Sequence, residues 1–376
     1  MTILTINTGS SSVRLAAFAS EAGTPNELAN VRHDLSDVEP RIILKEFVKT
    51  HGFMDISVVA HRVVHGGMKL TASCLVDKEV EREIENLAAL APLHNPVALD
   101  WIRATREVLH PGVAQVAVFD TAFFTALPEV ARTYAIPYEL TEKHGFRRYG
   151  FHGLAHQAMW RSWHESQRAS TAQEAKKEKV ITIQLGAGCS ITASNHGLPC
   201  DTSMGFSPLE GLIMATRSGD IDPGLITFLQ RQESLAPEQL DELLNERSGL
   251  LGISGISADI RRLLESDDER ARLAVDSYCY RVRKYLGAYL AVLGGADAIV
   301  FGGGVGENSP AVREKILAGM EWCGIEIDPE KNRCSNGMSR ISNSGSQVEV
   351  WVIPVNEALI LAQEAASVMA ADGNQN

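Results

Sequence analysis

The sequence lacks three features that would assign the protein to common functional classes. Its six cysteines form no C-x-x-C pair and follow irregular spacings, which argues against a zinc site and favours free thiols in a reducing compartment. It has no basic excess, since 47 Asp and Glu stand against 35 Lys and Arg, a net charge of −12. That balance argues against nucleic acid or an anionic membrane surface as the main partner. No apolar run reaches transmembrane length and no signal peptide precedes the first strand, so we expect a cytoplasmic protein without a membrane partner.

The composition is otherwise that of an ordinary globular protein, 45% hydrophobic and 22% charged over 376 residues. This length is sufficient for two domains with sizeable cores. An anionic substrate would require a local cluster of arginines within the overall negative charge.

The most informative stretch of the sequence is residues 180–224. An apolar run of β type breaks at the glycine-rich residues 186–188 and resumes at Cys189, which predicts a β-hairpin. Uncovered N–H groups in such a turn can hold a phosphate, although an ordinary hairpin turn has the same pattern. Arg217 then stands among three aspartates and several hydroxyl residues, which favours a packed loop for a charged ligand over a solvated surface loop.

A second strand–turn–strand unit at the N-terminus resembles this one. Residues 6–10 align with residues 183–187 at a constant offset of 177. Two such units half a chain apart indicate an internal duplication, and we expect two similar domains that face each other across a cleft.

Three charged residues lie at the ends of expected strands or helices. Arg62 interrupts the apolar strand 56–64, where a buried cation needs an anion, either a ligand or a structural partner. Asp120 follows the strand 113–119, at the position where α/β sheets place ligand groups, although Asp is equally common there as a turn or cap residue. Glu357 begins the last helix, where it either complements the helix dipole or holds a metal through water.

The apolar periodicity predicts the remaining elements. Residues 19–55 read as loop-rich apart from one helix near 40–50. The further helices and strands that we expect are helices at 77–90, 97–109, 154–168, 224–231, 237–246, 267–293 and 309–319, and strands at 298–301 and 348–353.

Ten motifs together resemble those of the acetate kinase family, ATP-dependent kinases of short-chain carboxylates in the actin-like superfamily. In family order they are NTGSSSVR, HRVVHGG, APLHNP, VFDTAF, RRYGFHG, LGAGCS, DTSMGFSPLEGL, TRSGDIDPG, FGGGVGENS and VNEAL. The resemblance implies an α/β protein with two duplicated actin-like (ribonuclease H-like) domains, each on a five-stranded mixed sheet, beside a nucleotide-binding cleft. We place the domains at 1–150 and 151–376, with the last helix returning to the first domain. The family also implies a homodimer.

The resemblance also implies roles for individual residues. Asn7 and Glu357 match the Mg²⁺ site, where Mn²⁺ is a substitute, and Arg62 matches the binder of the carboxylate and phosphoryl groups. Asp120 matches the catalytic aspartate, either a base or a group that orients metal-bound water; we favour orientation, because a carboxylate acceptor is already ionised. His152 and Arg217 match transition-state stabilisers. The residues that match the apolar pocket for the acetate methyl group are Val64, Leu93, Phe151 and Pro208.

The remaining matches concern the nucleotide. The residues that match the phosphate loop are Gln184, Leu185, Gly186, Ala187 and Gly188. The residues that match the adenosine pocket are Asp259, Ile260, Arg261, Gly304, Val305, Gly306, Glu307 and Asn308. Three positions depart from the common family pattern. Gln184 and Ala187 replace the usual histidine and asparagine, which removes a charge and a hydrogen-bond donor. Arg14 replaces the usual lysine, which keeps the charge in a planar fork.

We therefore expect reversible phosphorylation of acetate by ATP, giving acetyl phosphate and ADP by direct in-line transfer. The alternatives are a propionate or other short-chain carboxylate kinase, a pyrophosphate-linked variant, and a catalytically weak nucleotide-binding regulator. The glycine-rich adenosine loop argues against pyrophosphate, and the intact charged residues argue against a regulator.

Overall fold

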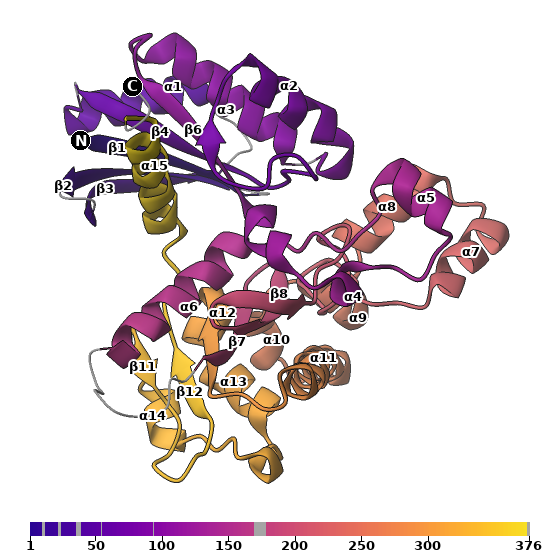
Figure 1. The fold of residues 1–376 in the computed structure, drawn as a ribbon. Helices are drawn as coiled ribbons and strands as arrows, with labels where there is room; N and C mark the ends of the chain where they lie inside the picture. The colour runs from indigo at the N-terminus through magenta and orange to yellow at the C-terminus, as the bar shows by residue number, and fades with distance from the viewer. Residues whose placement is uncertain are drawn as a thin grey trace. The chain divides into compact units, whose positions relative to one another are not determined.

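The structure, a computed structural model, describes residues 1–9, 12–21, 24–34, 39–53, 55–92, 94–168 and 178–373. The chain divides into two compact units (Figure 1). Unit 1 comprises Met1–Thr125 and Asn356–Asn376, and unit 2 comprises Ala126–Val355.

Unit 1 is built on a mixed sheet with the strand order β3-β2-β1-β4-β6-β5. The strands are β1 (Thr2–Thr8), β2 (Ser12–Glu21), β3 (Thr24–Asp34), β4 (Ile56–Val63), β5 (Cys74–Leu75) and β6 (Ala114–Phe119). Because β1, β4 and β6 run parallel, their carboxyl ends meet at one edge of the sheet. Side chains alternate between the faces, so the register places Asn7, Arg14 and Arg62 on the same face.

Helices cover both faces of this sheet (Figure 1). The helices of unit 1 are α1 (Pro40–His51), α2 (Lys78–Asn86), α3 (Asn95–Val108) and α15 (Glu357–Gly373), with short 3-10 helices η1 (Leu87–Leu90) and η2 (Asp120–Ala126). On one face Leu4, Ile6 and Leu15 pack with α1 and with Trp101 of α3 into a buried core. The C-terminal helix α15 lies across the other face, against β1 and β4.

Unit 2 repeats the same strand topology, in the order β9-β8-β7-β10-β12-β11. Its strands are β7 (Lys179–Leu185), β8 (Cys189–Asn195), β9 (Leu198–Thr202), β10 (Ala298–Gly302), β11 (Ser339–Arg340) and β12 (Glu349–Val352). Again the third, fourth and fifth strands of the sheet order, β7, β10 and β12, run parallel, and the other pairs are antiparallel. The bounds of β7 lie 177 residues after those of β1, which confirms the duplication predicted from the sequence offset.

Unit 2 contains more helices than unit 1. They are α4 (Glu129–Arg132), α5 (Tyr138–His144), α6 (Gly153–Arg168), α7 (Pro223–Gln232), α8 (Pro237–Glu246), α9 (Gly249–Ser254), α10 (Ile260–Leu264), α11 (Glu269–Leu293), α12 (Gly303–Asn308), α13 (Pro310–Leu317), η3 (Glu321–Cys323) and α14 (Pro329–Arg333). The longest, α11, begins at Asp268, whose side chain caps the helix, and ends at Gly294 in the left-handed conformation. Among the described residues, no helix is long and apolar enough to cross a membrane.

The structure confirms the helices expected from periodicity and corrects three other expectations. Each sheet has six strands rather than five, because the two-residue strands β5 and β11 pair at the edges. Residues 24–34, expected to be loop, form the edge strand β3. The glycine-rich segment 303–308, expected to be a turn, forms the short helix α12.

The compact units divide the chain at a different position from residue 150. Residues 126–150 belong to unit 2, because the Tyr149 N–H donates to Gly205 O (3.0 Å) and Arg148 pairs with Glu210 (2.6 Å). The last helix, α15, belongs to unit 1.

Candidate active site

An arginine–aspartate pair lies at the carboxyl ends of the parallel strands of unit 1. Arg62 is the penultimate residue of β4, and Asp120 directly follows β6. Arg62 Nη2 and Nε donate to Asp120 Oδ2 at 2.5 and 3.1 Å. The side chains are 11% and 1% exposed, so the pair is largely shielded from solvent screening.

Two further groups of unit 1 contact the same guanidinium. Arg62 Nη1 donates to Asn7 Oδ1 (3.2 Å) and to Thr8 O (3.3 Å), and it lies 3.9 Å from Glu357 Oε2. Burial disfavours the charged form of Arg62, but the negative charges of Asp120 and Glu357 outweigh it and raise the pKa of the guanidinium. Arg62 is therefore a permanent cation held in one orientation.

Asn7 and Glu357 lie side by side where the sequence predicted a magnesium site. Asn7 Nδ2 donates to Glu357 Oε2 at 2.6 Å, which joins the end of β1 to the first residue of α15. One carboxylate and one amide oxygen fit Mg²⁺, which takes oxygen ligands and retains several waters. Among the described residues there is no group of three His, Cys, Asp or Glu side chains that could hold a metal, so a metal here would depend on those waters. Arg14 is the register partner of Asn7 on β2 and is exposed.

The predicted phosphate turn joins β7 to β8. Leu185 and Cys189 are register partners, and the Gly186 N–H donates to Gly188 O (3.0 Å), so the hairpin prediction is confirmed. Ala187 is exposed at the tip of the turn, and its carbonyl accepts from the Ala215 N–H (3.1 Å). This bond ties the turn to the loop that carries Arg217.

His152 and Arg217 converge on Gly188. A Cβ atom at Gly188 would lie 3.2 Å from His152 Nε2 and 3.6 Å from Arg217 Nη1, so only glycine leaves this space open. His152 has a φ of 59°, in the left-handed region that a non-glycine residue seldom occupies, directly before α6. The two predicted stabilisers of unit 2 therefore both approach Gly188 in the phosphate turn.

Arg217 has no carboxylate partner among the described residues. Its Nη1 donates to Pro208 O (3.2 Å) and contacts Met214 Sδ at 3.8 Å. Burial lowers the pKa of this guanidinium, which reflects the cost of holding a cation there without an anion. An anionic ligand beside Gly188 would remove that cost.

Gln184 is half-buried, and its side-chain oxygen is a buried acceptor that is unsatisfied among the described residues. Its Oε1 has no hydrogen-bond partner among the described residues. The side-chain amide lies over the start of α12, because a Cβ at Gly303 would come within 2.7 Å of Gln184 Nε2. The residue that departs from the family pattern thus links β7 to the glycine-rich segment after β10.

The predicted adenosine residues lie in two segments of unit 2. Asp259 caps α10 by accepting from the Arg261 N–H (3.0 Å), and it pairs with the exposed Arg261 side chain at 2.7 Å. In α12, Glu307 Oε1 accepts from the N–H groups of Gly303 (3.0 Å) and Val355 (3.1 Å). These contacts are structural, and they leave Gly304 facing open space.

The predicted methyl pocket stays a prediction. Val64 is buried in unit 1, while Phe151 is buried and Pro208 half-buried in unit 2. Leu93 lies outside the described residues.

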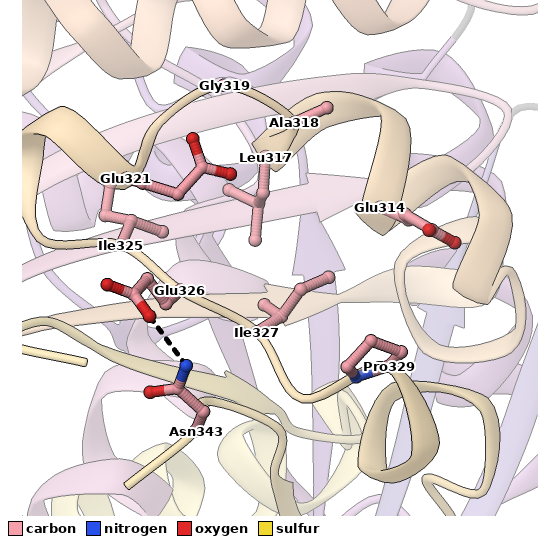
Figure 2. A pocket seen from close by; sticks show the side chains of 10 residues that line it. All are labelled: Glu314, Leu317, Ala318, Gly319, Glu321, Ile325, Glu326, Ile327, Pro329 and Asn343. Carbon is pink, nitrogen blue, oxygen red and sulfur yellow. Dashed lines mark hydrogen bonds between the residues drawn. The ribbon is translucent and has the colours of Figure 1, made fainter. Parts of the chain in front are cut away.

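Two surface pockets lie away from all of these residues. A pocket of about 490 Å³ borders α11 at Asp276, Tyr280 and Lys284. The other, of about 340 Å³, has the Glu326–Asn343 hydrogen bond in its wall (Figure 2). Its lining residues are Glu314, Leu317, Ala318, Gly319, Glu321, Ile325, Glu326, Ile327, Pro329 and Asn343.

Sequence reasoning missed the side chains that support His152. His152 Nδ1 lies 2.9 Å from Ser190 Oγ, and Ser190 Oγ lies 2.8 Å from His156 Nε2. Ser190 closes the LGAGCS motif, and His156 follows His152 by one helical turn, so these spacings were the available signal.

Comparisons with known proteins agree with the motif pattern. The chain matches the sequence profile of the Acetokinase family over residues 40–363. It is 50% identical over 316 residues to an acetate kinase from Chloroherpeton thalassium, covering 82% of this chain and 75% of that protein.

Two solved structures are similar to this fold over nearly the whole chain. A Porphyromonas gingivalis acetate kinase superposes with a TM-score of 0.87 at 37% identity, covering 98% of this chain and 99% of that one. A Francisella tularensis propionate kinase superposes with a TM-score of 0.86 at 35% identity, with 98% and 99% coverage.

Proposed function

This chain belongs to the acetokinase family, and we propose that it transfers the γ-phosphoryl group of ATP reversibly to acetate, giving ADP and acetyl phosphate. The observation that carries this proposal is the convergence of two side chains on Gly188. There Arg217, a half-buried cation without a carboxylate partner among the described residues, approaches His152 beside a glycine turn that can hold a phosphate.

The acceptor needs no base, because acetate is ionised at neutral pH. One carboxylate oxygen attacks the γ-phosphorus, a P–O bond to that oxygen forms, and the bond to the β-phosphate bridging oxygen breaks. Arg62 offers a fixed positive charge for the carboxylate and phosphoryl oxygens. Asp120 receives both the Nε and Nη2 hydrogen bonds of Arg62, which supports an orienting role for this aspartate.

Arg217 and His152 offset the charge that develops on the equatorial phosphoryl oxygens. Asn7 and Glu357 would hold Mg²⁺, or Mn²⁺ in its place, through one amide and one carboxylate oxygen. The metal supplies charge neutralisation of the phosphate oxygens when it is bound. Arg14, across from Asn7, adds a further positive charge for the nucleotide phosphates.

The nucleotide is assigned to unit 2. Residues 184–188 approach the phosphates, and the segments 259–261 and 304–308 hold the adenosine. The open space over Gly304 supports this assignment, since a backbone without a side chain allows close approach of a ligand.

The departures at Gln184 and Ala187 predict a slower enzyme rather than an inactive one. Ala187 is exposed at the tip of the turn, so Ala187→Asn adds a side-chain donor without a buried clash. We expect this variant to raise kcat by up to about tenfold, the scale of one added hydrogen bond to the phosphoryl group. Ala187→Val, which adds bulk but no donor, should give no gain; an equal gain in both variants would contradict the explanation.

The preferred carboxylic acid distinguishes an acetate kinase from its nearest alternative, a propionate kinase. The structural similarity to the Francisella protein is the reason to test this alternative. Packing against Val64, Leu93, Phe151 and Pro208 would disfavour one extra methylene by only about 1–3 kcal/mol. Acyl phosphate formed from Mg-ATP with acetate, propionate and butyrate, trapped with hydroxylamine, tests both functions. The highest rate with acetate is the expected result, and a preference for a longer acid would overturn it.

We also propose a homodimer in a reducing, cytoplasmic compartment. Family membership supports the dimer, and the six free cysteines support the compartment. Light scattering coupled to size-exclusion chromatography checks the first point: a mass near 40.8 kDa, that of one chain, would contradict it.

A further inference from the structure

Four side chains of unit 2 form a continuous hydrogen-bonded chain that ends at His152. Thr182 Oγ1 on β7 lies 2.7 Å from His156 Nδ1, and His156 Nε2 lies 2.8 Å from Ser190 Oγ. Ser190 Oγ in turn lies 2.9 Å from His152 Nδ1. Thr182, His156 and Ser190 are at most 1% exposed, so water does not replace these bonds.

The direction of the chain follows from Thr182. A hydroxyl group has one hydrogen to donate, and within the described residues the only hydrogen-bond partner of the Thr182 hydroxyl is His156 Nδ1. A buried hydroxyl hydrogen without an acceptor is destabilising, so Thr182 donates to His156. His156 Nδ1 is therefore an acceptor, and the ring hydrogen of neutral His156 lies on Nε2.

The same direction of hydrogen-bond donation determines which nitrogen of His152 carries the hydrogen. His156 Nε2–H donates to Ser190 Oγ, which leaves the Ser190 hydroxyl hydrogen for its other partner, His152 Nδ1. With Nδ1 accepting, neutral His152 carries its hydrogen on Nε2. That nitrogen is the one that lies 3.2 Å from the Cβ position of Gly188.

The charges around His152 agree with a neutral ring. Burial lowers the pKa of His156 well below its usual value, so His156 is neutral. The Arg217 cation also lies beside Gly188, and it disfavours a second positive charge there. A proton on His152 Nδ1 would also turn Ser190 into an acceptor from both rings, leaving its hydroxyl hydrogen buried without an acceptor.

From this geometry we propose that Thr182, His156 and Ser190 are positioning residues that hold His152 as a neutral hydrogen-bond donor through Nε2. Building on the proposed function, His152 gives the transferring phosphoryl group one directed hydrogen bond, while Arg217 supplies the charge. A fixed tautomer needs no rearrangement when the anion arrives, which is the advantage of a preorganised site.

Histidine tautomers are read directly by nitrogen-15 NMR on the full chain labelled at histidine. The His152 and His156 signals are assigned by their loss in His152→Gln and His156→Gln. At pH 7.5 we expect both rings to show a protonated Nε2 and a bare Nδ1, and Ser190→Ala to convert the His152 signal to a mixture of tautomers. A hydrogen on His152 Nδ1 in the unmodified protein would overturn the proposal. This measurement requires no turnover, so its result does not depend on whether the proposed kinase activity is correct.

Kinetics separate positioning from a general structural role. Thr182→Val keeps the shape of the side chain but removes the first donor, and it should lower kcat about tenfold while the KM for acetate changes less than twofold. Thr182→Ser should restore the rate. Thr192→Val is the matched control, since Thr192 is the register partner of Thr182 on β8 but bonds to Thr202 instead. Equal rates for Thr182→Val and Thr192→Val, with an unchanged His152 tautomer, would also overturn the proposal.

Discussion

At the carboxyl ends of the strands in unit 1, three side chains surround one cation. Arg62 donates to Asp120 and Asn7 and lies 3.9 Å from Glu357. Removing one partner therefore changes the orientation of the cation as well as the local charge. Substitutions here should affect turnover more than the stability of the fold.

Asp120→Asn tests the orienting role of the aspartate. Asparagine retains one acceptor for Arg62 but loses the negative charge, so we expect kcat to fall about 10²-fold or more, by analogy with other preorganised groups. The free energy of unfolding in urea should fall by only about 1–3 kcal/mol. Glu81→Gln is a control, because Glu81 pairs with Arg103 and Arg106 on the surface of α2 and α3. Full activity in Asp120→Asn would rule the role out.

Gly188→Ala tests the convergence of His152 and Arg217 on Gly188 in unit 2. The added methyl group would lie 3.2 Å from the His152 ring, which must shift by a few tenths of an ångström, and at an ordinary contact distance of 3.6 Å from Arg217. We expect a folded protein whose kcat is reduced about tenfold to 10²-fold, since small misplacements near the reacting group are costly. Gly287→Ala in α11, where a Cβ meets nothing within 4 Å, should keep full activity. A Gly188→Ala enzyme with unchanged kcat would contradict the site.

At the residue scale, the sequence predicted which residues lie together better than it predicted the hydrogen bonds between them. The motifs named Arg62, Asp120, Asn7 and Glu357, and the structure brings these four together. They did not show that Asp120 binds Arg62 through two nitrogens, since this depends on the register of β4 with β6. The chain through Ser190 was missed for the same reason.

At the scale of elements, buried histidines make β4 and the turn after it sensitive to acid. Burial lowers the pKa of His61 and of His65 to about 4. The unfolded chain binds these protons near pH 6.5 and the folded chain only near pH 4, so stability is lost as the pH falls through this window. His61 Nδ1 also has no hydrogen-bond partner within the described part of the chain.

His61→Met should make the protein less sensitive to acid. The variant removes one group that must be charged on unfolding, so the loss of unfolding free energy between pH 7 and pH 4.5 should shrink by about 2 kcal/mol. Urea unfolding at the two pH values measures this difference. An unchanged loss would mean that other groups determine the acid sensitivity.

Elements with an apolar stripe were predictable, and elements stabilised by tertiary contacts were not. β3 pairs only with β2 at the sheet edge and is mostly exposed, so its sequence shows no apolar alternation. The helix α12 contains three glycines, and its ends are held by the Glu307 carboxylate and by Arg313, which donates to Gly306 O and Glu307 O. No local propensity would predict a helix there.

At the scale of the whole molecule, two units share one strand topology, and a single offset of 177 residues predicted it. The boundary between them was not predictable, because residues 126–150 carry their own motifs but bind to unit 2 through Arg148 and Tyr149. Sequence patterns show which segments are regular, whereas domain membership depends on contacts between distant segments.

Deleting residues 356–376 tests how far unit 1 depends on its last segment. The deletion removes Glu357 and uncovers the sheet face on which Ile360, Leu361 and Ala365 are buried. We expect the variant to lose its activity and the cooperative unfolding of unit 1, which is monitored by the fluorescence of Trp101. We also expect it to aggregate through the exposed apolar face. A control that removes only residues 374–376 should behave as the full chain. A folded, monodisperse product of the larger deletion would contradict this expectation.

The discontinuity of unit 1 also has a consequence for biosynthesis. About 230 residues separate Thr125 from the segment whose helix α15 covers one face of the sheet. At ordinary translation speeds of about 5–20 residues per second, the ribosome needs roughly 10–50 s to supply them. During that interval the nascent N-terminal sheet has one uncovered face, which is a binding surface for chaperones. Glu357 contacts Asn7 and Arg62, so a chain terminated before residue 357 cannot assemble this cluster.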